Sequence, residues 1–255
     1  MKKGAKIALG LGCGLVSACV IGLAVTGYEI GWGPFRSLFK GFEAEVAAIE
    51  QKYDAGTRKG EIVFYGASNF RLWTEMENDL SDYKVQNHGF GGSTDKLLVQ
   101  YADRILYPYE PKIVFFQTGS NDYAELPGTD EDKVAACMAY KREMFAAFHE
   151  RLPEAKFVVM SGLLLPGRSR YTALTQEINR QLESLCAEHA DYMTFVNAEA
   201  MTFDGENYAE ELFISDKIHL NHAGQLCWCE GYIRPALEAI VESRQWNDLR
   251  TEGGA

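Results

Sequence analysis

The sequence predicts an α/β fold in which one parallel sheet is covered by helices on both faces. Short apolar runs rich in β-branched and aromatic residues alternate along the chain with longer segments of helical periodicity, and this alternation is typical of parallel sheets. Polar clusters follow several of the apolar runs directly, as loops at the carboxyl edge of such a sheet do. With 255 residues and 47% hydrophobic content, the chain is long enough for one large core.

Five segments have the length and composition of strands, and the segments between them have the spacing of amphipathic helices. The expected strands are residues 62–65, 84–87, 112–118, 157–161 and 193–197. The expected helices are residues 69–80, 94–106, 131–151, 172–189 and about 222–246. Pro235 falls inside the last helix, where it should kink the helix or split it in two. The order of these elements predicts a five-stranded parallel sheet.

Residues 1–30 are expected to lie outside the globular domain, as a transmembrane anchor or signal segment. Lys2, Lys3 and Lys6 precede residues 7–25, which carry no charge and are long enough to cross a bilayer as a helix. We expect a single-pass cell-membrane anchor with the amino terminus inside and the domain extracytoplasmic. A cleaved secretory signal, or a lipid anchor at Cys19 in the motif VSAC, remains an alternative.

Residues 31–60 are expected to form an amphipathic helix followed by a linker. Apolar side chains recur at helical spacing over about residues 35–54, so this helix would lie along the membrane or pack against the domain. Residues 56–60 are polar and glycine-rich, and we expect the globular domain to occupy residues 61–255.

The charge argues against a nucleic-acid-binding protein, and the positions of the cysteines argue against a fold held together by disulfides. A formal net charge of −11 would repel a polyanion, so we expect no nucleic-acid partner. The six cysteines lie in the amino-terminal segment and in expected helices, so buried thiols are favoured over a disulfide framework, although one pair could oxidise outside the cytoplasm.

Four polar clusters could meet at one edge of the sheet. Ser68 follows the first strand in a turn of small residues, and the other clusters are residues 87–94 (NHGFGGST), 119–122 (GSND) and 216–219 (DKIH). Because parallel strands of one sense end at the same edge, we expect these clusters to converge on one crevice. Each cluster alone could be a turn or a helix cap, but together they are complementary.

The residue types fit an acyl-transfer site. Ser68 would be the nucleophile, which needs a base to take its proton. His219 would be that base, and Asp216 would hold the imidazole in the correct tautomer. The negative oxygen that develops on the attacked carbonyl needs donors, which Ser68, Gly92 and Asn121 could supply as two backbone N–H groups and a side-chain amide.

In order and spacing, these four blocks resemble the signature blocks of the SGNH/GDSL hydrolases, the GDSL-like lipases and esterases. The resemblance covers about residues 62–240. It implies a flavodoxin-like three-layer sandwich and a serine esterase that uses no metal or other cofactor. It also implies a catalytic triad of Ser68, Asp216 and His219 and an oxyanion hole of Ser68, Gly92 and Asn121. Ala67 departs from the family pattern, which often has Asp at this position.

We therefore expect a serine esterase that cleaves small acyl esters linked to carbohydrate or lipid. An O-acyltransferase with the same site and a non-catalytic, envelope-anchored binding domain are alternatives. A metal hydrolase is a further alternative, with ligands drawn from Asp216, His219, His222, Cys227 and Cys229. Four aromatic residues could line the substrate pocket or belong to the core, namely Phe70, Trp73, Phe90 and Tyr123.

Overall fold

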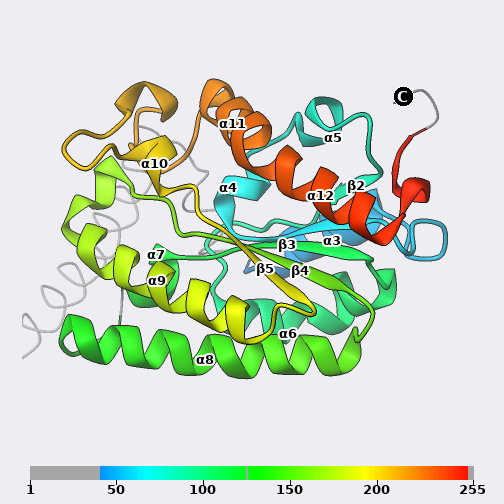
Figure 1. Ribbon diagram of the computed structural model, residues 1–255, viewed down its shortest axis with the longest axis horizontal. Helices are drawn as coiled ribbons and strands as arrows, with labels where there is room; N and C mark the ends of the chain where they lie inside the picture. The colour runs from blue at the N-terminus through cyan, green and yellow to red at the C-terminus, as the bar shows by residue number, and fades with distance from the viewer. Residues whose placement is uncertain (1–40, 125, 252–255) are drawn as a thin grey trace, which may run out of the picture. The chain divides into compact units, whose positions relative to one another are not determined.

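The computed structural model describes residues 41–124 and 126–251 (Figure 1). A compact unit begins at Glu45. The segment expected to cross a membrane, residues 7–25, lies outside the described residues, as does the first part of the expected amphipathic helix. Within the described part of the chain, no helix is both long and apolar enough to cross a membrane.

The core of the unit is a five-stranded, all-parallel sheet, as expected from the sequence. Its order is β2-β1-β3-β4-β5, which is the flavodoxin order. The strands are β1 (Ile62–Gly66), β2 (Val85–Asn87), β3 (Ile113–Gln117), β4 (Lys156–Met160) and β5 (Met193–Val196). Every residue of the central strands β1 and β3 is buried, because helices cover both faces of the sheet.

Two layers of helices enclose this sheet (Figure 1). The layer on one face consists of α6 (Asp95–Ile105), α8 (Asp130–Arg151) and α9 (Thr172–Glu188). The layer on the other face consists of α4 (Ser68–Arg71), α5 (Met76–Asp79), α11 (His222–Trp228) and α12 (Arg234–Arg244). Two further one-turn helices, α7 (Ser120–Tyr123) and α10 (Glu199–Thr202), lie in loops that follow strands. The expected three-layer α/β arrangement is therefore confirmed.

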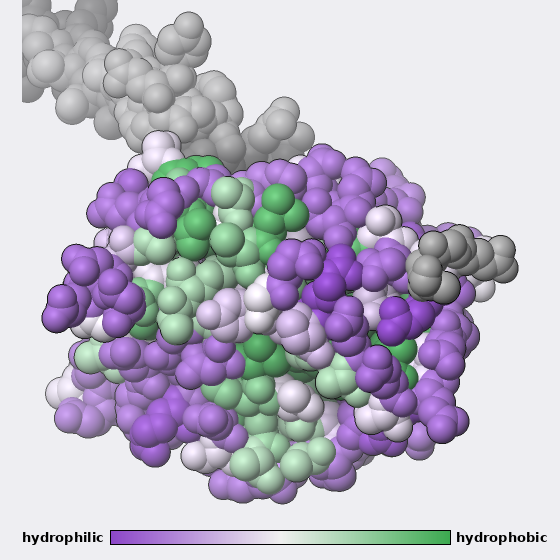
Figure 2. Space-filling view, turned by 45° about the horizontal axis from the view of Figure 1, so that its top comes forward, coloured by the Kyte–Doolittle hydropathy of each residue, from purple (hydrophilic) through white to green (hydrophobic). Residues whose placement is uncertain are grey.

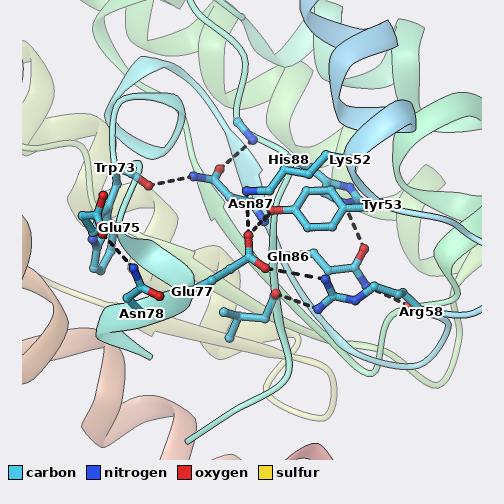
Figure 3. A network of polar contacts seen from close by, with 12 residues as sticks. Lys52, Tyr53, Arg58, Trp73, Glu75, Glu77, Asn78, Gln86, Asn87 and His88 are labelled. Atoms are coloured by element: carbon cyan, nitrogen blue, oxygen red, sulfur yellow. Dashed lines mark hydrogen bonds and ion pairs between the residues drawn. The ribbon is translucent and has the colours of Figure 1, made fainter. Parts of the chain in front are cut away.

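The single helix expected over residues 69–80 is wrong. The chain forms two short helices there, α4 and α5, because the Asn87 side-chain amide donates hydrogen bonds to the carbonyls of Phe70 (2.7 Å) and Trp73 (3.2 Å). The contact with Trp73 is visible in Figure 3. The indole N–H of Trp73 also donates to Asp79 Oδ2 (2.6 Å). Ser68 consequently begins a single helical turn, which has a much smaller dipole than the long helix that periodicity indicated.

Pro235 splits the last helix, as expected. Helix α11 ends at Trp228, a π-helical turn covers Cys229–Ile233, and α12 begins at Arg234. The backbone stays helical through this junction, and Pro235 occupies the first turn of α12, where proline is tolerated.

The end of α3 (Glu43–Lys52) is joined to the end of β2 by a polar network (Figure 3). The Tyr53 hydroxyl donates to Glu77 (2.8 Å) and accepts from the backbone N–H of Asn87 (3.0 Å). Lys52 forms an ion pair with the same Glu77 carboxylate (2.6 Å). Val46 and Ile49 of α3 are buried, so these two apolar side chains of the expected amphipathic helix belong to the core.

The four aromatic residues considered for a substrate pocket also belong to the core. Phe70, Trp73, Phe90 and Tyr123 are at most 2% exposed, and Phe70 stacks on Trp228 with ring centroids 5.3 Å apart. None of the four lines the cavity at Ser68 described below. Of the two interpretations, the burial of these residues supports the core.

The described cysteines are unpaired thiols. Cys137, Cys186 and Cys229 are buried and Cys227 is exposed.

On the face shown in Figure 2, hydrophilic residues occupy most of the margins and apolar residues gather near the centre. Large apolar side chains that are well exposed in the described residues are confined to Val99, Ile214 and Leu226.

Candidate active site

Ser68, His219 and Asp216 form a continuous chain of hydrogen bonds. His219 Nε2 lies 2.8 Å from Ser68 Oγ, and His219 Nδ1 lies 2.6 Å from Asp216 Oδ2. A carboxylate can only accept, so the proton of a neutral imidazole is on Nδ1 and Nε2 accepts the Ser68 hydroxyl proton. The arrangement prepares Nε2 to act as a base toward Ser68.

Asp216 is held in the ionised form that this arrangement requires. Burial raises the pKa of Asp216, but hydrogen bonds from the His219 ring and from the backbone N–H groups of His219 and Ile218 outweigh burial and hold the pKa below its ordinary value. The two backbone donors lie 2.9 and 3.0 Å from Asp216 Oδ1. They leave Oδ2 for the imidazole.

Contacts on either side of Ser68 fix its position. Gly66 is so close to β3 that a Cβ atom there would lie 2.2 Å from the carbonyl oxygen of Gln117, and the Ala67 N–H donates to that same oxygen (3.0 Å). On the other side, the buried Asn69 accepts a hydrogen bond through Oδ1 from the backbone N–H of Leu220 (3.2 Å). The neighbours of Ser68 and of His219 are thus directly bonded.

The loops after β2 and β3 meet beside Ser68. Asn121 lines the same cavity as Ser68 and His219, and its Nδ2 donates to the carbonyl of Ser93 (3.2 Å). Gly92 precedes Ser93 and has a φ of 75°, a left-handed conformation that favours glycine. Gly92 itself does not line the cavity. The structure therefore brings four of the five sequence-predicted residues into contact or into one cavity, and places Gly92 in the adjoining loop.

A buried ion pair fastens these two loops to helix α8. Lys141 and Asp95 are 4% and 2% exposed and lie 2.8 Å apart, and Lys141 also donates to Thr118 Oγ1 (2.7 Å). The backbone N–H of Asp95 donates to Asp122 (2.8 Å). Burial, together with the negative charge of Asp95, raises the pKa of Asp122 to about 7. Asp122 follows Asn121 directly, so the contacts among Lys141, Asp95 and Asp122 hold the backbone that carries the Asn121 side chain.

The cavity at Ser68 is small, about 40 Å³. Its apolar wall contains Leu163, Leu165 and Ile218. Its polar wall contains Arg168, whose guanidinium donates hydrogen bonds to Ser120 Oγ and, at 3.3 Å, to Asn121 Oδ1.

The residues that sequence reasoning missed are Asn69, Asp95, Lys141 and Arg168. A signal for Lys141 was present, because it interrupts a stripe of apolar residues at helical spacing, including Cys137, Met138, Met144 and Phe145, and a charge within such a stripe is usually paired. Arg168 had no comparable signal, since it lies in an irregular connection after β4.

The alternative set of metal ligands does not gather in one place. His222 contacts Asp79 (3.1 Å), Cys229 is buried and Cys227 is exposed. Among the residues described, no three His, Cys, Asp or Glu side chains are grouped as a metal site would need.

Comparisons with known proteins agree with the fold and with the motifs. The model of the GDSL-like Lipase/Acylhydrolase family matches residues 56–226. A search of curated proteins gave no match.

Several solved structures share the fold. One, from Streptococcus pneumonia and provisionally described as a platelet activating factor, has a TM-score of 0.65 and 19% identity, covering 82% of this chain and 96% of its own. A GDSL-like lipase from Bacteroides thetaiotaomicron has a TM-score of 0.57 and 21% identity, covering 79% and 98%. A mutant acetyl-xylooligosaccharide esterase from Geobacillus has a TM-score of 0.51 and 16% identity, covering 66% and 90%.

Proposed function

The chain belongs to the GDSL-like lipase/acylhydrolase family and is a hydrolase of esters, and from this premise we propose that it cleaves small acyl esters through a triad of Ser68, His219 and Asp216. The observation that carries the proposal is the hydrogen-bonded chain from Ser68 Oγ through the His219 ring to Asp216, at 2.8 and 2.6 Å. The family match confirms the resemblance seen in the motifs, while the roles of the individual residues are our proposal.

In the first half of the reaction, Ser68 Oγ attacks the carbonyl carbon of the ester while His219 Nε2 takes the hydroxyl proton. The imidazolium that forms is stabilised by the ionised Asp216. The tetrahedral intermediate then expels the alcohol, which receives the proton from Nε2, and the acyl group remains on Ser68. In the second half, a water molecule loses its proton to Nε2 and attacks the acyl-enzyme. The bond between Ser68 Oγ and the acyl carbon then breaks, Ser68 Oγ takes the proton back from Nε2, and the acid is released.

The negative oxygen of each tetrahedral intermediate would be stabilised by an oxyanion hole. We propose its donors to be the backbone N–H groups of Ser68 and Gly92 and the side-chain amide of Asn121. Support comes from Asn121, which lines the cavity, and from the contact of its Nδ2 with Ser93, the residue that follows Gly92.

The size of the cavity favours a short acyl group. Its volume is about 40 Å³, whereas pockets for drug-sized ligands occupy roughly 300–1,000 Å³. Leu163 and Leu165 supply an apolar wall of the kind that an acetyl group would contact. The Geobacillus relative is described as an acetyl-xylooligosaccharide esterase, and an acetylated carbohydrate is the substrate class we propose here, with acylated lipids as the second class to test.

A panel of p-nitrophenyl esters tests the proposal. We expect acetate to be hydrolysed with a higher kcat/KM than butyrate and octanoate, and the activity to be lost in Ser68→Ala. Ser184→Ala is the matched control, because Ser184 is exposed on α9 and, within residues 41–124 and 126–251, its hydroxyl donates to the Arg180 carbonyl alone. Equal rates in Ser68→Ala and the unmodified protein would rule out the proposed nucleophile, and a preference for octanoate would rule out the short acyl group.

A further inference from the structure

The guanidinium of Arg168 lacks a carboxylate partner in the described part of the chain, although the chain as a whole is acidic. Among the residues that the structure describes, no Asp or Glu lies within ion-pair distance of its guanidinium, whereas Arg58, Arg104 and Arg234 each have such a partner. The guanidinium instead faces the cavity that contains Ser68. An arginine in this position therefore serves the cavity rather than a surface ion pair.

The contacts of Arg168 determine the orientation of the Asn121 side-chain amide, that is, the positions of its oxygen and its NH2 group. An amide side chain is almost symmetrical in shape, so its orientation follows from its hydrogen bonds. A guanidinium can only donate, and its Nη1 lies 3.3 Å from Oδ1 of Asn121. The Ser93 carbonyl can only accept, and it lies 3.2 Å from Nδ2. These two contacts fix the oxygen toward Arg168 and the NH2 group toward Ser93.

This orientation leaves one amide proton available. The NH2 group has two protons, and in the described residues only the Ser93 carbonyl accepts one of them. Asn121 lines the cavity, so the second proton can reach an oxygen that develops negative charge there. If the amide turned over, its carbonyl oxygen would face that oxygen and repel it.

The backbone that carries Arg168 is itself tied to the catalytic loop. The N–H of Gly167 donates to the carbonyl of Lys217 (2.8 Å), and a Cβ atom on Gly167 would lie 2.8 Å from the carbonyl oxygen of Asp216. Arg168 thus reaches Asn121 from a segment in direct contact with the loop that carries Asp216 and His219. Ser120 Oγ accepts a second hydrogen bond from the same Nη1 and anchors the guanidinium.

From this geometry we infer that Arg168 is a positioning residue that holds the Asn121 amide with its N–H, and not its oxygen, toward the reacting carbonyl. The inference rests on the proposed function, since it concerns the oxyanion hole of that site. Its consequence is a loss that appears in the transition state, where the oxyanion exists, more than in substrate binding.

The experiment compares Arg168→Met, Arg168→Lys, Asn121→Ala and the double variant Arg168→Met/Asn121→Ala on p-nitrophenyl acetate. Removing one donor from an oxyanion hole lowers kcat by roughly 10²–10³-fold, so misaligning it should lower kcat by about 10–100-fold in Arg168→Met. We expect KM to change by less than about 3-fold, Arg168→Lys to recover part of the rate, and the double variant to be no slower than Asn121→Ala. Arg170→Met is the matched control, because Arg170 is exposed and contacts the Tyr171 ring.

Besides a fully active Arg168→Met protein, two results would overturn the inference. One is a double variant whose loss is the product of the two single losses, since that shows independent roles. The other is a loss confined to an anionic ester such as 4-acetoxybenzoate and expressed in KM, since that shows an anion-binding role. Thermal melts monitored by circular dichroism establish that each variant is folded. If Arg168→Met does not fold, the same comparison of kcat and KM is made with Arg168→Lys. A Ser68→Ala protein that is inactive while Arg168→Met is fully active refutes only this inference, whereas an active Ser68→Ala protein refutes the proposed function.

Discussion

Replacing Lys141 with Met should strongly destabilise the protein. The Lys141 side chain is 4% exposed and bonds to both oxygens of Asp95 (2.8 and 3.1 Å) and to Thr118 Oγ1 (2.7 Å). Methionine fills similar volume but leaves the Asp95 carboxylate buried without a cation. Breaking a buried pair by removing one partner costs about 3–5 kcal/mol, which corresponds to a fall in Tm of roughly 6–20 °C for a domain of this size.

The pH dependence of this loss identifies its cause. The charge of Lys141 keeps the pKa of Asp122, about 7, from being raised further by burial and by Asp95, so removing Lys141 should raise the pKa of Asp122 in the folded state. A raised folded pKa means that the folded protein binds more protons than the unfolded chain, so stability falls as pH rises toward that pKa. The deficit of Lys141→Met relative to the unmodified protein should therefore be larger at pH 8 than at pH 5.

Urea unfolding at pH 5 and pH 8, followed by circular dichroism, measures the deficit. Arg142→Met is the matched control, since Arg142 is the next residue on α8 and its ion pair with Glu188 is about half exposed. We expect this control to lose less than about 1 kcal/mol. A Lys141→Met protein within 1 kcal/mol of the unmodified protein at pH 8, with unchanged esterase activity, would refute the idea that this pair holds the loops together.

Three further predictions concern single residues around the site. Asp216→Asn should lower kcat by roughly 10⁴-fold without a large change in Tm, because an amide can hold His219 in the wrong tautomer. Steady-state kinetics measures kcat and circular dichroism measures Tm, and a fall in kcat of less than about 10-fold would contradict the prediction. The pKa of Asp122 is about 7, well above its unfolded value, so the contribution of Asp122 to stability declines as pH rises from about 5 to 8. The free energy of unfolding of Asp122→Asn, measured in urea, should therefore increase by roughly 2 kcal/mol relative to that of the unmodified protein between pH 5 and pH 8. A difference that does not change with pH would contradict a buried carboxylate. Gly66→Ala should lose about 1–3 kcal/mol or more, because its Cβ would meet the Gln117 carbonyl, and an unchanged Tm would show that β1 and β3 can separate freely.

Strands β1, β3 and β4 were predictable because each is a short apolar run that is buried along most or all of its length. Asp216 and His219 were predictable for a related reason, since they are three residues apart in one loop and their pairing is local. The meeting of that loop with Ser68 followed from the rule that parallel strands end at one edge.

The parts that could not be predicted depend on contacts between distant segments. Helical periodicity continued through residues 69–80, but the Asn87 side chain takes up the carbonyls of Phe70 and Trp73, and no local pattern shows this. Arg168 acts on Asn121 from a connection after another strand, so its importance depends on the folded geometry alone.

The most direct test of the proposed triad is covalent labelling with a fluorophosphonate ester, followed by mass spectrometry of the digested protein. The account predicts one adduct, on the peptide containing Ser68, formed in parallel with the loss of ester hydrolysis and greatly slowed in His219→Ala. An adduct on a different serine, or full hydrolytic activity in protein whose Ser68 is completely labelled, would contradict it.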